Sequence, residues 1–264
     1  MIVRAKKRLG QHFLEPPWAD RLVQKIGPQP VDHVLEIGPG PGALTLRLAR
    51  QVEHLTAVEV DGDMADALGP RLPANVSLVR QDVLEFDLLA LASRDLRVAG
   101  NLPYNLSSPI LFKLLRARRD GARLVDATLM VQREVADRIG GKPGSKDYGT
   151  LAIFVALRAD VQRLLELPPG AFRPMPKVHS TVLRLEFRDP KVSIADEAIF
   201  ERMVRTIFTQ RRKTVANALK PFAEERGGDA RAALARAGLD GMRRPEQLQL
   251  TELAQLADVL ASGM

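Results

Sequence analysis

Apolar and polar positions follow two alternating patterns over roughly the first 190 residues. Short apolar runs bounded by turn-forming residues predict strands, and stretches with apolar residues three or four positions apart predict helices. Strands are predicted at 33–37, 55–60, 76–80, 96–100, 127–131, 161–167 and 180–187. Helices are predicted at 17–26, 43–50, from 61 to about 72, and from 109 to 116. Strands that alternate with helices favour an α/β fold with a mostly parallel sheet covered on both faces.

The pattern changes near Asp196 and is helical from there to the end. Its apolar residues recur at helical spacing, and glycines interrupt it at 227–228, 238 and 241. The stretch 140–149 is rich in glycine, and 168–176 is too rich in proline for a strand or a helix. We therefore expect two domains: residues 1–190, which carry the sheet, and residues 191–264, which form a small all-α domain.

The net charge of +7 and the sequence pI of about 10.0 indicate a polyanionic partner, with nucleic acid as the first candidate. The positive charge is gathered in three blocks, which suits a phosphate backbone contacted at several points better than it suits a membrane. The blocks are Arg4, Lys6, Lys7 and Arg8; Lys113, Arg116, Arg118, Arg119 and Arg123; and Arg202, Arg205, Arg211, Arg212, Lys213 and Lys220.

Several classes of protein are disfavoured by what the sequence lacks. It has no apolar run long enough for a membrane span, and its basic N-terminus lacks the apolar core of a secretory signal. Cysteine is absent and the four histidines are far apart in sequence, so we expect neither disulfides nor a metal site. We expect a cytoplasmic protein.

Four consecutive predicted strands end in residues that suit ligand binding. The turn 38–42 (GPGPG) follows the first, Glu59 ends the second, Asp82 follows the third and Asn101 follows the fourth. The carboxyl ends of parallel strands form one edge, where ligands bind in open sheets. Ordinary polar residues at loop starts explain any one of these positions, but explain all four poorly.

The glycine turn alone is compatible with NAD, FAD, S-adenosylmethionine or no ligand. Its G-x-G-x-G spacing differs from the dinucleotide-binding G-x-G-x-x-G, and no Gly-Lys-Ser/Thr follows. Glu59 lies about 20 residues after Gly38, where a carboxylate can accept hydrogen bonds from ribose hydroxyls. Asp82 can accept a hydrogen bond from an adenine amino group.

The segment Asn101-Leu102-Pro103-Tyr104 is poor core material at a strand end. Asn101 offers a donor and an acceptor, Pro103 leaves a nearby carbonyl without a helical partner, and Tyr104 offers a flat face. Together they can hold a planar base by its amino group and stack on it. The alternative is a plain strand-to-helix turn with a polar cap.

Together these residues resemble the ribosomal RNA adenine N6-dimethyltransferases over nearly the whole chain. The closest likeness is to the bacterial enzymes of small-subunit (16S) rRNA, the kasugamycin-sensitivity type. The motifs that carry the resemblance are KKRLGQHFL (6–14), VLEIGPGPGALT (34–45), VEVDGDM (58–64), QDVLEFD (81–87), NLPYNLSSPILFKLL (101–115), FRPMPKV (172–178) and FTQRRKTVANAL (208–219).

The resemblance implies a Rossmann-like class I methyltransferase sheet with S-adenosylmethionine as cofactor. Position by position, it implies cofactor contacts from His12, Leu14, Gly38, Gly40, Glu59, Asp82 and Asn101. The family often has GQNFL where this chain has GQHFL, which leaves the contact of His12 open.

The implied reaction is direct methyl transfer to adenine N6, at two adjacent adenosines near the 3′ end of 16S rRNA in an immature subunit. The Asn101 oxygen and a carbonyl near Leu102-Pro103 accept the two N–H bonds of the amino group, and Tyr104 stacks on the extruded base. Phe172 is either a second face of that clamp or a core residue. Arg211, Arg212 and Lys213 are expected to contact rRNA, in a monomer without metal or membrane contact.

Three rival functions remain open from the sequence. The first is a large-subunit rRNA adenine methyltransferase of the macrolide-resistance type, which shares the fold. The second is an RNA-binding assembly factor without activity, which the intact Glu59, Asp82 and NLPY disfavour. The third is a nicotinamide dehydrogenase, which the glycine spacing disfavours.

Overall fold

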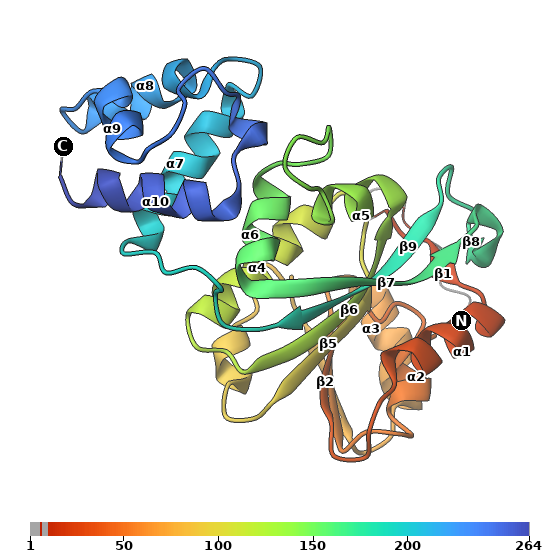
Figure 1. Ribbon diagram of the computed structural model, residues 1–264. Coiled ribbons are helices and arrows are strands. Elements are labelled where there is room, and N and C mark those ends of the chain that lie inside the picture. The colour runs from red at the N-terminus through yellow and green to blue at the C-terminus, as the bar shows by residue number, and fades with distance from the viewer. Residues whose placement is uncertain (1–5, 7–9, 264) are drawn as a thin grey trace. The chain divides into compact units, whose positions relative to one another are not determined.

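The computed structural model describes residue 6 and residues 10–263, which divide into two compact units (Figure 1). The first, called the sheet unit here, comprises the chain up to Ala136 together with Ala159–Arg188. The second, the helical unit, comprises Asp137–Arg158 and the chain from Asp189 onward. The expected division at 190 therefore differs for residues 137–158, which group with the helical unit.

The sheet unit contains a seven-stranded sheet in the order β4-β3-β2-β5-β6-β9-β7. The strands are β2 (His33–Ile37), β3 (His54–Glu59), β4 (Val76–Arg80), β5 (Leu96–Asn101), β6 (Leu124–Gln132), β7 (Ala159–Leu167) and β9 (Ser180–Phe187). Strands β2 to β6 are parallel, and β9 is antiparallel to both of its neighbours. A short antiparallel pair joins β1 (Phe13–Leu14) to β8 (Phe172–Arg173). The predicted mostly parallel α/β sheet is confirmed.

Four helices accompany these strands within the sheet unit: α1 (Pro16–Ile26), α2 (Thr45–Leu48), α3 (Gly62–Leu68) and α4 (Ser107–Arg119). Helix α2 is shorter than the predicted 43–50, because the glycine turn before it continues as irregular turns up to Leu44. Helix α3 is prolonged by a 3₁₀ turn at Gly69–Arg71, and further 3₁₀ turns lie at Leu88–Leu91 and Pro169–Ala171. Helix α5 (Arg133–Ile139) spans the point where the chain first passes between units.

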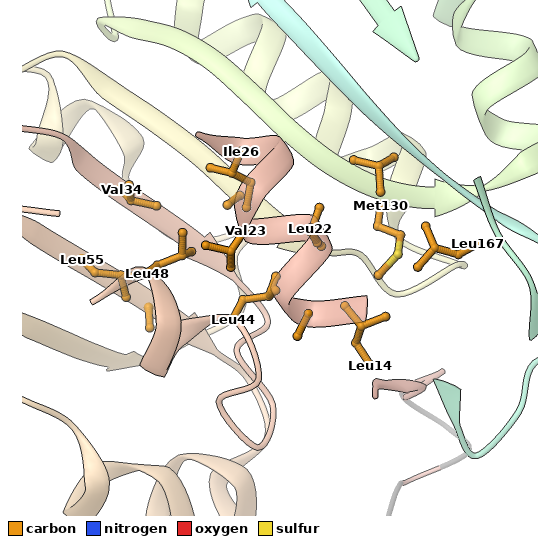
Figure 2. Close-up of a cluster of buried hydrophobic side chains, with 14 of the residues drawn as sticks. Leu14, Leu22, Val23, Ile26, Val34, Leu44, Leu48, Leu55, Met130 and Leu167 are labelled. Atoms are coloured by element: carbon orange, nitrogen blue, oxygen red, sulfur yellow. The ribbon is translucent and has the colours of Figure 1, made fainter. Parts of the chain in front are cut away.

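A hydrophobic cluster around α1 includes residues that follow the glycine turn (Figure 2). Leu22, Val23 and Ile26 of α1 are buried in it with Leu44 and Leu48, which follow the turn. Each such side chain contributes about 1.5–3 kcal/mol when fully buried. The residues that precede and follow the turn are therefore held in place by packing.

The helical unit contains α6 (Thr150–Arg158), α7 (Glu197–Thr209), α8 (Val215–Glu225), α9 (Ala230–Arg236) and α10 (Leu250–Ala261), with a 3₁₀ turn at Pro245–Gln247. Side chains of Asp196, Thr214 and Asp229 cap α7, α8 and α9 by accepting backbone N–H bonds. Helix α6 is buried at nearly every position, with the Phe154 ring edge-on to Phe200 of α7. That all-round apolar character hides helical periodicity, so the sequence pattern did not reveal α6. No helix among the described residues has the length and apolarity that a membrane crossing requires.

Candidate active site

The glycine turn after β2 needs glycine for two separate reasons. Gly38, Gly40 and Gly42 all have left-handed backbone angles, with φ of 68°, 53° and 88°. A Cβ on Gly42 would lie 2.5 Å from Leu68 Cδ1, and one on Gly40 would lie 3.3 Å from the Phe13 ring. Glycine therefore permits the left-handed backbone of the turn, and it leaves room for Phe13 beside Gly40 and for Leu68 beside Gly42.

Glu59 ends β3 with its carboxylate held by the backbone on both sides. Its Oε2 accepts from Gly40 N at 2.9 Å, and its Oε1 accepts from Asp61 N at 2.8 Å. The residue is 5% exposed. Burial raises the pKa of the Glu59 carboxyl, and the two backbone N–H groups oppose that rise. Each oxygen retains a second acceptor direction, so the group can still receive a ligand hydroxyl.

Asp82 lies just after β4 and uses only one oxygen internally. Its Oδ1 accepts from Leu84 N at 2.8 Å, which closes a tight turn. Its Oδ2 receives no hydrogen bond from any residue that the structure describes. A ligand amino group at this edge would find that oxygen available.

Asn101 ends β5 with its amide orientation fixed. Its Nδ2 donates to the His12 carbonyl at 2.8 Å, so Oδ1 is left to accept from a ligand. The Pro103 carbonyl accepts from Leu106 N and Ser107 Oγ at the start of α4. The Leu102 carbonyl, in contrast, receives no donor from the described part of the chain. Of the two carbonyls that the sequence left open, Leu102 is therefore the better second acceptor.

Tyr104 and His12 are fixed against each other. Their rings stack at 5.3 Å with an interplanar angle of 26°, and the Tyr104 hydroxyl lies 2.9 Å from Ser180 Oγ. Burial raises the pKa of the Tyr104 hydroxyl, so it stays neutral at physiological pH. His12 Nδ1 lies 2.7 Å from the Pro174 carbonyl, which only accepts, so Nδ1 carries the proton. One face of Tyr104 is thus covered by His12.

These groups line one pocket at the carboxyl edge of the sheet. Its walls come from residues 10–14, 36–41, 43–44, 58–60, 81–83, 101–106 and 110. The structure brings together His12, Leu14, Gly38, Gly40, Glu59, Asp82, Asn101, Leu102, Pro103 and Tyr104, all named from the sequence. Residues 7–9 of the KKRLGQHFL motif lie outside the described residues.

Phe172 is the exception among the predicted pocket residues. It is fully buried, does not line the pocket and packs in the hydrophobic cluster with Leu14 and Leu22. The pairing of β8 with β1 draws it inward, opposite Leu14. The alternative of a core residue therefore describes Phe172 in this structure, and its assignment as a second face of the clamp is corrected.

Comparison with known proteins identifies the family. The model of the family described as ribosomal RNA adenine dimethylase matches residues 2–261. The chain belongs to this family. The curated relatives include proteins named ribosomal RNA small subunit methyltransferase A from Xylella fastidiosa (strain Temecula1), 42% identical, and Xanthomonas oryzae pv. oryzae (strain PXO99A), 44% identical. The alignments cover 96% and 97% of this chain and 95% and 96% of the relatives.

Two solved structures extend the likeness to the fold. A dimethyladenosine transferase from Plasmodium falciparum has a TM-score of 0.75 at 22% identity, covering 93% of this chain and 96% of that one. The 23S rRNA methyltransferase ErmE has a TM-score of 0.66 at 26% identity, covering 94% and 99%. The predicted Rossmann-like methyltransferase fold is confirmed, and the dehydrogenase alternative is set aside.

As a ribosomal RNA adenine dimethylase, the protein is an S-adenosylmethionine-dependent methyltransferase. The pocket fits that cofactor by its hydrogen-bond acceptors: carboxylates at or just after the ends of β3 and β4 can accept from ribose hydroxyls and an adenine amino group. The apolar side chains of Ile37, Val58 and Leu102 provide walls for the rest. The prediction of this cofactor from the sequence is confirmed.

Glu36 is a pocket residue that sequence reasoning missed, because it was counted with the strand HVLEI. It is 1% exposed and lines the pocket, and its Oε2 and the neighbouring Thr45 Oγ1 lack a hydrogen-bond partner. Burial raises the pKa of Glu36 to about 7. A carboxylate inside an otherwise apolar strand, directly before a glycine turn, was the signal available.

In the helical unit, the three predicted RNA contacts differ from one another. Arg211 is engaged internally: Nε pairs with Glu246 at 2.8 Å, and its other nitrogens donate to the Lys146 and Ser145 carbonyls. Arg212 and Lys213 are exposed and have no ion-pair partner among the described residues. Arg211 therefore stabilises the unit, and its neighbours present free charge.

Arg244 extends that charged surface and was also missed from the sequence. It is exposed, and Val215 N donates to the adjacent Arg243 carbonyl at 2.6 Å. Ala216 N likewise donates to Gly241 O at 3.2 Å, so the loop before Arg244 lies along the segment after Lys213. Arg244 lies about thirty positions after Lys213 in the chain, so the sequence gave no signal that the two residues are neighbours.

Proposed function

We propose that this protein methylates N6 of two adjacent adenosines near the 3′ end of 16S rRNA, forming dimethyladenosine in an immature small subunit. The observation that carries the proposal is the pair of open acceptors, Asn101 Oδ1 and the Leu102 carbonyl, beside the cofactor pocket. The choice of the small subunit is supported by the names of the curated relatives at 41–44% identity.

The proposed mechanism addresses the weak nucleophilicity of adenine N6, whose lone pair is delocalised into the ring. Asn101 Oδ1 and the Leu102 carbonyl accept hydrogen bonds from the two N–H groups of the adenine amino group. These hydrogen bonds favour a more tetrahedral nitrogen whose lone pair is directed at the methyl group. When bound, S-adenosylmethionine would supply that methyl from its sulfonium, the S–CH3 bond breaking to leave S-adenosylhomocysteine. Positioned acceptors of this kind act mainly on the transition state. The extra proton on N6 passes to solvent after attack, so no side-chain base is required.

The substrate base must leave its stack to reach these acceptors. Tyr104 is held by Ser180 and backed by His12, so one face of its ring remains to stack on the base. Cofactor contacts are assigned to His12, Leu14, Gly38, Gly40, Glu59 and Asp82. We also propose that the protein acts as a monomer in the cytoplasm and without a metal ion.

The test of the target is mass spectrometry of rRNA from cells that lack the gene, before and after its return. We expect dimethyladenosine to disappear from 16S rRNA and to reappear only with the gene. Purified protein should methylate precursor small subunits and leave 23S rRNA unmodified. Methyl groups found on 23S rRNA would assign the protein to the large-subunit type.

Arg212 and Lys213 are proposed as phosphate contacts, with Arg244 beside them. Replacing Arg212 and Lys213 by alanine should lower the slope of log affinity against log salt by about 2, because each phosphate contact contributes close to 1. Binding of precursor subunits would be measured at several salt concentrations. The Arg202→Ala variant is the matched control, because Arg202 already pairs with Glu225. An unchanged slope for the double variant would remove both residues from the interface.

A further inference from the structure

Residues 10–14, called the strap here, cross the cofactor pocket and are fastened on both sides. At one end, Phe13 and Leu14 pair with Arg173 and Phe172. In the middle, the His12 carbonyl accepts from Asn101, and the Phe13 ring lies close to Gly40. All five strap residues line the pocket. The strap therefore spans from the β5 end toward the β3 end.

Asp61 fastens the other end of the strap. Its Oδ2 accepts from Gln11 Nε2 at 2.9 Å, and its Oδ1 accepts from Lys6 Nζ at 2.6 Å. Gln11 Oε1 in turn accepts from Lys6 N at 2.7 Å, so the three residues close a ring of hydrogen bonds. The Asp61 side chain is fully buried, whereas the second carboxylate near Lys6, Asp63, is 71% exposed.

The backbone of Asp61 faces the cofactor side. Its N–H donates to Glu59 Oε1 at 2.8 Å, and Glu59 Oε2 accepts from Gly40 in the glycine turn. The same residue thus holds the strap through its side chain and the ribose-binding carboxylate through its main chain. Although burial works against ionisation, the hydrogen bonds from Lys6 and Gln11 hold the pKa of Asp61 below its usual value.

We propose that Asp61 is a positioning residue that couples closure of the strap over the pocket to the grip of Glu59 on the cofactor. Losing the carboxylate leaves Lys6 and Gln11 without their common acceptor, which frees the strap at its β3 end. The freed strap then closes the pocket less completely, and its hold on Asn101 through the His12 carbonyl weakens. The inference rests on cofactor binding by this family and not on which rRNA is the target.

The test is a double-mutant cycle on Asp61 and Lys6, with binding of S-adenosylhomocysteine measured by calorimetry. Asp61→Asn keeps Oδ1, which caps α3 at Asp63 N and accepts from Lys6, but it removes the charge and puts an amide nitrogen where Gln11 Nε2 donates. We expect it to weaken binding about ten- to a hundredfold, as for other charged hydrogen bonds. Lys6→Met removes the ammonium group that donates to Asp61, at a residue before the strap, and should also weaken binding. The double variant should bind no more weakly than Asp61→Asn.

Asp63→Asn is the matched control, because it removes the exposed carboxylate that contacts the same Lys6 at 2.7 Å. Its affinity should stay within about twofold of wild type, as is usual for an exposed ion pair. Thermal unfolding without ligand separates folding from coupling, since a purely structural role would lower the unfolding temperature and leave the affinity of the folded protein intact. Near-wild-type affinity in both Asp61→Asn and Lys6→Met, or strictly additive losses, would overturn the proposal.

Discussion

The two edges of the parallel sheet use polar residues in opposite ways. At the amino edge, Arg97 at the start of β5 donates to Asp32 and Asp126 and to the Ile26 and Gly27 carbonyls at the end of α1. At the carboxyl edge, Asp82 and Asn101 each use one side-chain atom internally and leave the other open. The first arrangement is closed on itself, and the second has capacity for a ligand.

Polar residues at the amino edge of the sheet therefore serve stability, and those at the carboxyl edge are available for ligand binding. A half-buried guanidinium that satisfies two carboxylates and two carbonyls stabilises the fold only while all its partners remain. A side chain held by a single internal hydrogen bond is oriented, and its other polar atom remains available to a ligand, as a binding site requires. Side chains at the two edges should therefore respond to mutation in different measurements.

The largest effect is expected at the amino edge. Arg97→Met leaves Asp32 and Asp126, which are 14% and 10% exposed, without their common partner. Breaking such a pair from one side costs about 3–5 kcal/mol of unfolding free energy. Urea unfolding should show that loss while the affinity of the folded protein for S-adenosylhomocysteine is unchanged. Arg94→Met, whose pair with Glu53 is exposed, should cost less than about 1 kcal/mol. A comparable loss in both variants would contradict the comparison.

The next effect is expected in catalysis. Asn101→Ala removes the oxygen that we propose accepts from adenine N6. Loss of one positioned hydrogen-bonding group lowers turnover by about a hundred- to a thousandfold. Transfer of labelled methyl groups to precursor subunits measures it, and the urea midpoint should change little. Asn217→Ala, an exposed amide on α8, controls for the general effect of the substitution. Full activity in Asn101→Ala would end its assigned role.

At the carboxyl edge, the buried carboxyl of Glu36 has an oxygen without a hydrogen-bond partner, which costs stability when the group ionises. Its pKa is about 7 in the folded protein against an ordinary value of 4.5, so the folded state binds more protons between these values. The stability contributed by protonated Glu36 is therefore lost as pH rises through about 7. Relative to wild type, Glu36→Gln should gain about 2 kcal/mol of unfolding free energy between pH 5 and pH 8. Parallel pH profiles for the two proteins would refute this.

The smallest effect is expected for cofactor affinity at Glu59. In Glu59→Gln one amide nitrogen faces a backbone N–H of Gly40 or Asp61, so one hydrogen bond is lost. We expect about tenfold weaker binding of S-adenosylhomocysteine by calorimetry. Glu53→Gln, an exposed carboxylate at the amino edge, is the control and should bind normally. Equal affinities for Glu59→Gln and wild type would remove Glu59 from the site.

The sequence predicted much of the carboxyl edge because parallel topology alone brings consecutive strand ends together. Glu59, Asp82 and Asn101 each follow a recognisable strand, and their convergence needs no knowledge of side-chain packing. The strands of the seven-stranded sheet were found within a few residues, and the prediction of a mostly parallel sheet was correct. The short strands β1 and β8 were missed, and the prediction that 168–176 is too rich in proline for a strand was wrong for Phe172–Arg173.

The remainder depended on contacts between distant parts of the chain. Phe172 is drawn inward by pairing with β1, and Arg211 is claimed by Glu246 and by carbonyls of the loop before α6. Neither partner is visible in local spacing. The closed network around Arg97 was likewise invisible, because its members lie far apart in sequence.

The excursion of the chain from Asp137 to Arg158 has a practical consequence. Helix α6 has a largely apolar surface and belongs with helices that follow much later in the sequence, yet it is encoded between β6 and β7. Truncation near residue 190 would therefore remove Phe200 and the other packing partners of Phe154. Helix α6 would then expose an apolar surface that is prone to aggregation. A fragment limited to the sheet unit would require excision of residues 137–158 and a short designed linker between Ala136 and Ala159.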